Sequence, residues 1–171
     1  MDRKLVFGLR RAKGFSSRLI EWFGAGGFSH AEVMDQQGWW WSARSEACWV
    51  DKFYYPKGFW SRPPNYCKDE LWIFTVEVSE EEYTKFWAFV KLQEGKPYDW
   101  LAILHFGLRW LRLKRNWRDP SSWFCSEVMA AACESAGVFE KLFKRFVSVT
   151  PGDFALLLVG RKAKYYKVNV A

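Results

Sequence analysis

The stretch "SSWFCSEVMAAACESAGV", residues 121–138, decides the fold, because an apolar helix begins within it and carries a cysteine at its start. Ser121 or Ser122 can cap this helix, which would put Cys125 in the first turn. Free backbone N–H groups and the helix dipole stabilise a thiolate there and lower the thiol pKa from its ordinary value of about 8.5. Cys125 is therefore either a nucleophile or a small buried hydrophobe like Cys133 on the same helix.

A nucleophilic cysteine needs a base within hydrogen-bond reach, and the segment "GGFSHAEV" offers His30. This segment is typical of a strand, in which Ala31 and Val33 point to the face opposite His30 and Glu32. If the two apolar residues face the core, His30 and Glu32 face a cleft. The alternative is that His30 is an ordinary structural or surface histidine.

A hairpin is predicted from the strand-like segments 28–34 and 39–45. If Gly38 adopts the left-handed conformation, the loop has three residues and Asp35 pairs with Trp39. A loop of two residues would instead turn the second strand over, because successive side chains of a strand alternate between faces. The loop length therefore decides which residues share a face with the histidine.

A third polar group should orient the imidazole of the base. In the three-residue register, Glu32 lies opposite Ser42, and Ser42 is a diagonal neighbour of His30 on the same face. Ser42 and Glu32 are thus both candidate orienting residues. Each is alternatively a polar strand residue that faces solvent.

The remaining pattern predicts an α+β protein with one domain, residues 1–171. The segment 51–70 is predicted to be irregular, because Pro56, Pro63 and Pro64 interrupt any periodicity.

In "GKPYDW" (95–100), Tyr98 can direct a phenol into the cleft, or the segment is only a turn between helices. The expected strands are 4–9, 28–34, 39–45 and 70–78, and the expected helices are 16–23, 80–95 after Ser79, 98–112, the Cys125 helix and 150–159.

The composition fits a compact globular protein, with 50% hydrophobic residues and 12 Trp, 15 Phe and 7 Tyr. The formal charge is +7, and residues 108–118 are basic without an acidic residue. Such a patch favours anionic partners such as phospholipid, nucleic acid or a virion subunit, or it is a solvated helix end. No nucleic-acid-binding motif accompanies it.

Metal and membrane signals are weak in this sequence. The 4 cysteines form no C-x-x-C pair and there are only 2 histidines, so we expect no zinc site and no cofactor. The N-terminal stretch lacks the apolar region of a signal peptide, and no stretch has the length of a membrane span. We therefore expect synthesis and folding in a reducing cytoplasm, with free thiols.

Five blocks occur in a recognisable order: "FSHAEV", "WWWSARSE", "GKPYDW", "WFCSEV" and "VTPGDFALLL". In this order they resemble the circularly permuted branch of the NlpC-type papain-like cysteine peptidases and amidases, most of all members encoded by bacteriophages. The blocks run from about residue 14 to 158. The resemblance implies a small antiparallel sheet packed against helices, with the nucleophile at a helix N-terminus.

The resemblance also implies roles for residues. Cys125 would be the nucleophile and His30 the base, and Ser42 would occupy the third position. Relatives outside the phage group often carry Glu at that position, and a neutral serine stabilises an imidazolium less, so Glu32 is the alternative. The resemblance assigns Tyr98 and Ser126 to oxyanion or substrate binding. His105 matches no family position and is expected to be structural.

The resemblance implies a thiol hydrolase that cleaves the amide bonds of a peptidoglycan stem peptide or another small peptide-like substrate. One alternative is a structural protein of a phage tail or tail tip with weak or no activity, associated with the virion. A further alternative is a lipid esterase or acyltransferase.

Overall fold

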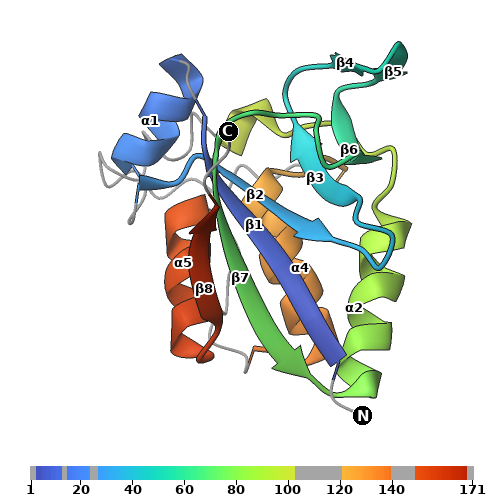
Figure 1. The fold of residues 1–171 in the computed structure, drawn as a ribbon, viewed down its shortest axis with the longest axis vertical. Helices are drawn as coiled ribbons and strands as arrows, with labels where there is room; N and C mark the ends of the chain where they lie inside the picture. The colour runs from blue at the N-terminus through green and yellow to red at the C-terminus, as the bar shows by residue number, and fades with distance from the viewer. Residues whose placement is uncertain (1–2, 13–14, 24–26, 103–120, 140–148, 169–171) are drawn as a thin grey trace.

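The computed structural model of the chain describes residues 3–12, 15–23, 27–102, 121–139 and 149–168. They form a mixed α+β fold around an antiparallel sheet with the strand order β6-β3-β2-β1-β7-β8 (Figure 1). The strands are β1 (Arg3–Arg11), β2 (His30–Met34), β3 (Trp40–Arg44), β4 (Cys48–Val50), β5 (Phe53–Tyr55), β6 (Gly58–Arg62), β7 (Glu70–Val78) and β8 (Lys164–Val168). The helices are α1 (Phe15–Phe23), α2 (Glu80–Leu92), α4 (Cys125–Ala136) and α5 (Pro151–Gly160).

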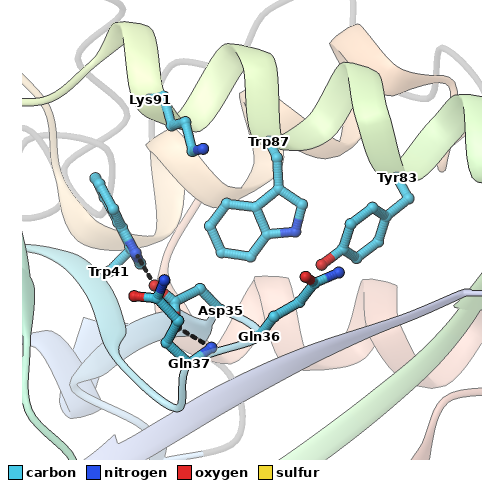
Figure 2. Close-up of a pocket in the computed structure, with 7 residues that line it drawn as sticks. All are labelled: Asp35, Gln36, Gln37, Trp41, Tyr83, Trp87 and Lys91. Carbon is cyan, nitrogen blue, oxygen red and sulfur yellow. Dashed lines mark hydrogen bonds between the residues drawn. The ribbon is translucent and has the colours of Figure 1, made fainter.

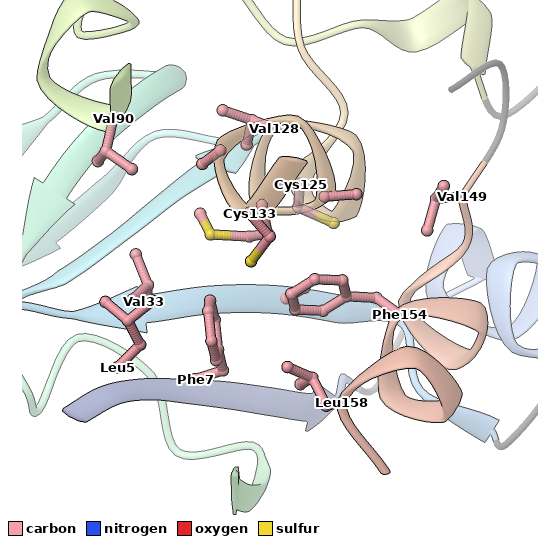
Figure 3. Close-up of a cluster of buried hydrophobic side chains, with 14 of the residues drawn as sticks. Leu5, Phe7, Val33, Val90, Cys125, Val128, Cys133, Val149, Phe154 and Leu158 are labelled. Atoms are coloured by element: carbon pink, nitrogen blue, oxygen red, sulfur yellow. The ribbon is translucent and has the colours of Figure 1, made fainter. Parts of the chain in front are cut away.

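One face of the sheet is apolar and is covered by α2, α4 and α5. Strand β1 lies between β2 and β7, and its Phe7 pairs with Val33 on one side and Phe74 on the other. Because side chains alternate along a strand, Leu5 and Leu9 share this face, and both are buried. Figure 3 shows side chains of α4 and α5 over β1 and β2 in this core.

The opposite face of the sheet carries a second, smaller cluster of buried residues. Trp40 and Ile73 come from the sheet, Val50 comes from the β4–β5 hairpin, and Tyr66 comes from the segment after β6. This layer changes the expected environment of the polar residues of β2. Glu32 on this face is completely buried, so it does not line an open cleft.

The predicted hairpin register is confirmed between β2 and β3. The backbone N–H of Asp35 donates to the carbonyl of Trp39 at 2.9 Å, and Gly38 has a φ of +85°. Val33 pairs with Trp41, so His30 and Ser42 point to the same side of the sheet by alternation.

Two of the predicted helix starts are confirmed and one is wrong. Ser79 and Glu82 form a capping box at the start of α2, and Thr150 caps α5. The N-cap of α4 is Phe124, which has no side-chain capping bond, rather than Ser121 or Ser122. Cys125 is thus the first residue of its helix.

Several other boundaries differ from the prediction. Strands β5 and β6 lie inside the segment 51–70, which was expected to be irregular, and helix α2 ends at Leu92 rather than at Gly95. The predicted helix 98–112 lies mostly outside the described residues, as do His105 and the basic stretch 108–118. Within the described part of the chain, no helix combines the length and apolar character needed to cross a membrane.

Candidate active site at the start of helix α4

The segments around residues 97–99 and Trp123, which are far apart in the sequence, run side by side just before Cys125. The backbone N–H of Trp123 donates to the carbonyl of Pro97 at 3.0 Å, and that of Asp99 donates to the carbonyl of Trp123 at 3.0 Å. Tyr98 is therefore held beside the start of α4, where its ring lies 5.7 Å from that of Phe124. Burial and the neighbouring Cys125 raise the pKa of the Tyr98 phenol well above its ordinary value.

The thiol of Cys125 is almost completely buried, with 1% of the residue exposed. The backbone N–H groups of Ala31 and Ser126 bond its sulfur and favour a thiolate, but burial raises the pKa to about 12. This differs from the low pKa expected at a helix N-terminus. Desolvation of the sulfur outweighs the bonds from the two N–H groups, so the thiol is neutral in the free protein.

His30 is the first residue of β2 and is also buried, at 8% exposure. Its Nε2 has no hydrogen-bond partner among the described residues and lies 3.8 Å from a carboxylate oxygen of Glu32. Burial, followed by the charges of Arg44 and Arg10, lowers the pKa of His30 well below its ordinary value. The imidazole is therefore neutral, which is the form that can accept a proton.

Glu32 forms the centre of a buried polar cluster. One carboxylate oxygen accepts a hydrogen bond from Nε of Arg10 at 2.6 Å, and the other accepts one from the hydroxyl of Tyr66. Burial raises the pKa of Glu32, while Arg10 and Tyr66 oppose this shift. Because the second oxygen is also the one nearest to His30, Glu32 is placed to stabilise a charged imidazole.

Ser42 lies on the predicted face but is not bonded to the histidine. It is completely buried, and its hydroxyl oxygen has no hydrogen-bond partner among the described residues. Of the two candidate orienting residues, Glu32 is thus the one within ion-pair range of His30.

Arginines 10 and 44 belong to the site, although the sequence analysis assigned no role to either. The guanidinium of Arg44 lies 5.0 Å from the centre of the Tyr66 ring, and its charge acts on both His30 and Cys125. Arg10 pairs with His30 in the β1–β2 register. The sequence did contain one signal for a buried charge: Arg10 directly follows the apolar residues of the predicted strand 4–9.

The structure joins the predicted site residues into two groups. Cys125 packs with Ala31 on the helix-covered face, whereas His30 and Glu32 belong to the other face of β2. Nε2 of His30 has no hydrogen-bond partner among the described residues, so it makes no hydrogen bond to the sulfur of Cys125. The hydroxyl of Ser126 donates to the carbonyl of Val149 at 2.5 Å, so it ties α4 to the segment before α5.

Metal chemistry has no evident ligand set in the described part of the chain, where no three His, Cys, Asp or Glu side chains are grouped to hold an ion. The polar groups on the two sides of β2 are a thiol, an imidazole, a carboxylate, the phenols of Tyr66 and Tyr98 and the guanidinium groups of Arg10 and Arg44. This set suits proton transfer and nucleophilic attack. No model of a known protein family matches the chain, and no curated protein is significantly similar to it.

Proposed function

We propose that the chain is a thiol hydrolase of the permuted papain-like (NlpC-type) kind, which cleaves amide bonds through an acyl-enzyme on Cys125. The observation that carries the proposal is the position of Cys125, the first residue of α4, against the backbone of Ala31 and beside Tyr98. Ala31 directly follows His30, so the thiol and the imidazole approach the same end of β2. The substrate class is a peptidoglycan stem peptide or a similar small peptide-like amide.

Catalysis begins with both reacting groups neutral. His30 takes the proton of the Cys125 thiol as the sulfur attacks the substrate carbonyl carbon, and the carbonyl oxygen becomes an oxyanion. The backbone N–H of Cys125 and the hydroxyl of Tyr98 donate to this oxygen. The imidazolium then gives its proton to the leaving amine, and water hydrolyses the thioester with His30 again as the base.

Glu32 assists by stabilising the imidazolium while it exists. Its carboxylate oxygen lies 3.8 Å from Nε2 of His30, whereas Ser42 is neutral and makes no bond to it. The imidazole has to turn toward the sulfur for the first step, because His30 lies on the face of β2 opposite the one against which Cys125 of α4 packs in the free protein. Substrate binding is the event that supplies this rearrangement.

The competing function is a structural one, in which a phage tail protein uses the fold with weak or no activity. The burial of Cys125 and the absence of a hydrogen-bond partner for Nε2 of His30 among the described residues favour this alternative. The two functions differ in whether the sulfur of Cys125 ever forms a covalent bond to a substrate.

The test is to incubate the protein with purified muropeptides and small peptide amides and to identify products by mass spectrometry. We expect cleavage by the wild type and a loss of at least about three orders of magnitude in rate for Cys125→Ala. Cys133→Ala is the matched control, because Cys133 is buried on the same helix and takes no part in the chemistry.

The proposal is overturned if the folded wild-type protein cleaves none of these substrates and no acylating peptide probe becomes attached to Cys125. Equal melting temperatures of the wild type and Cys125→Ala would show that the comparison concerns chemistry rather than folding. If the folded protein shows neither cleavage nor labelling of Cys125, the structural function is the correct one.

A further inference from the structure

A pocket of about 320 Å³ lies between the β2–β3 turn and one face of α2 (Figure 2). Residues 35–37 and Trp41 line one side, and Tyr83, Trp87 and Lys91 line the other. The three residues of α2 are spaced four apart, so they lie on one face of the helix. Asp35, which lines the pocket, lies about 16 Å along the chain from His30, since a strand advances about 3.3 Å per residue. The pocket is therefore separate from the candidate active site.

The wall formed by the turn is fixed before any ligand arrives. One oxygen of the Asp35 carboxylate accepts hydrogen bonds from the backbone N–H groups of Gln37 and Trp39, each at 2.9 Å. The other oxygen accepts one from the indole N–H of Trp41, also at 2.9 Å (Figure 2). Both the backbone of the turn and the plane of the Trp41 ring are thus set by Asp35, which reduces the entropy lost on binding.

Three aromatic rings meet at angles in this pocket. The ring centres of Trp41 and Trp87 are 6.3 Å apart with an angle of 72° between the planes. Those of Tyr83 and Trp87 are also 6.3 Å apart, with an angle of 57°. The rings therefore form a corner rather than a flat platform or a parallel slot.

Two polar groups beside this aromatic corner, on Trp87 and Lys91, are available to a ligand. Trp87 is 8% exposed, and its indole nitrogen has no hydrogen-bond partner among the described residues. Figure 2 shows this nitrogen on the ring edge that faces Tyr83 and the exposed side chain of Gln36. A ligand oxygen that displaced the Gln36 amide would give the indole an acceptor. The ammonium of Lys91 makes no ion pair with the described residues.

These groups discriminate between classes of small ligand. An organic cation is disfavoured, because Asp35 already accepts three hydrogen bonds and Lys91 is positive. A flat nucleobase stacks best on a single ring face, which an angled corner does not offer. A pyranose sugar can place C–H groups against two rings at once and direct its hydroxyl groups to Gln36, Gln37 and Lys91.

We propose that this pocket between the β2–β3 turn and α2 is a binding site for a pyranose sugar. The proposal rests on the aromatic corner, on the indole nitrogen of Trp87, which has no partner among the described residues, and on the side-chain amides of Gln36 and Gln37. It does not require Cys125 to be reactive, so it can hold or fail independently of the proposed hydrolase function.

The test uses the Cys125→Ala protein with nitrogen-15-labelled tryptophan, so that no turnover complicates the titration. The probes are a tetramer of N-acetylglucosamine, maltotetraose, choline and adenosine. We expect at least one of the oligosaccharides to shift the indole signals of Trp41 and Trp87, assigned by single Trp→Phe replacements. The expected dissociation constant is about 1 mM, because the pocket holds one sugar ring.

Two variants change the pocket without touching the candidate active site. Tyr83→Ala removes one wall and Gln36→Ala removes one exposed amide, and each is expected to weaken sugar binding about fivefold. Trp49→Phe is the control, because Trp49 is an exposed aromatic residue on the β4–β5 hairpin. It should leave the affinity unchanged.

The proposal is overturned if neither oligosaccharide shifts the two indole signals. It is equally overturned if choline or adenosine shifts them while the sugars do not, or if Tyr83→Ala and Gln36→Ala both bind sugar as the parent does.

Discussion

Glu32 and Arg10 illustrate at the scale of single residues how the fold tolerates charge in its interior. Glu32 is completely buried and Arg10 is 1% exposed, and the two are joined by a hydrogen bond of 2.6 Å. We predict that Glu32→Gln destabilises the protein by about 3–5 kcal/mol, because the substitution leaves the guanidinium of Arg10 buried without its counter-charge. Urea unfolding monitored by circular dichroism measures this change.

The matched control is Glu80→Gln, which removes the carboxylate of an exposed pair with Arg3. Water screens that pair, so the urea midpoint should hardly move. If Glu32→Gln were as stable as Glu80→Gln, the buried pair would not have the structural role assigned to it.

The identities of the residues around the candidate site were predictable only in part. Cys125 and His30 stand out, because each occupies a distinctive local position, a helix start and a strand start. Arg44 and Tyr66 gave no such signal, since their importance arises from strand pairing and a loop that folds over the sheet. The pKa of Cys125 was also not predictable, because burial depends on how tightly α4 packs against β2.

Strand β1 fixes the position of Glu32 at the scale of secondary structure. Gly8 lies opposite Glu32, and a Cβ atom at this position would be 2.9 Å from both a Glu32 oxygen and the Trp40 ring. We predict that Gly8→Ala destabilises the protein by about 1–3 kcal/mol, because one of these buried side chains must move. Thermal unfolding gives the stability, and any hydrolase activity should fall with it as Glu32 is displaced.

Gly160→Ala is the control for this substitution. Gly160 is the last residue of α5, and nothing lies within 4 Å of the Cβ that the change would add. An alanine there should be neutral or slightly stabilising, because it restricts the unfolded chain. Equal melting temperatures for the two variants would show that β1 has room beside Glu32.

The elements differ in how well local sequence specified them. Strand β7 was predicted at residues 70–78, since its apolar residues alternate well enough for a strand, and α5 was marked by Thr150 and Pro151. Strand β6 was missed, because prolines flank it and its pairing with β3 is a long-range contact. The start of α4 was misplaced because Phe124 is an N-cap without a polar side chain.

The pH dependence of stability is a property of the whole molecule that His30 influences. Its pKa in the folded protein is well below the value of about 6.5 of an unfolded chain. Below pH 6.5 the unfolded chain therefore binds a proton that the folded protein does not, so stability decreases as the pH falls. We predict that the wild type loses up to about 1.4 kcal/mol per pH unit from this group, measured by urea unfolding between pH 7.5 and about pH 5.

The control is His30→Gln, which keeps a polar side chain but cannot titrate in this range. Its stability should change less with pH, and the difference between the two proteins isolates His30 from the other titrating groups. Identical pH profiles would mean that the pKa of His30 is the same in the folded and the unfolded protein, which would contradict the prediction.

The burial of the Cys125 sulfur also affects how fast this thiol reacts with oxidants. Peroxides and disulfides react with thiolates, and a free thiol with a pKa of about 8.5 is a few per cent ionised at neutral pH. A pKa of about 12 reduces that fraction by about three orders of magnitude. Oxidative damage to Cys125 then proceeds only when the start of α4 opens transiently and exposes the sulfur. The lifetime of the reduced Cys125 thiol in aerated buffer is therefore set by a local opening equilibrium rather than by the concentration of the oxidant alone.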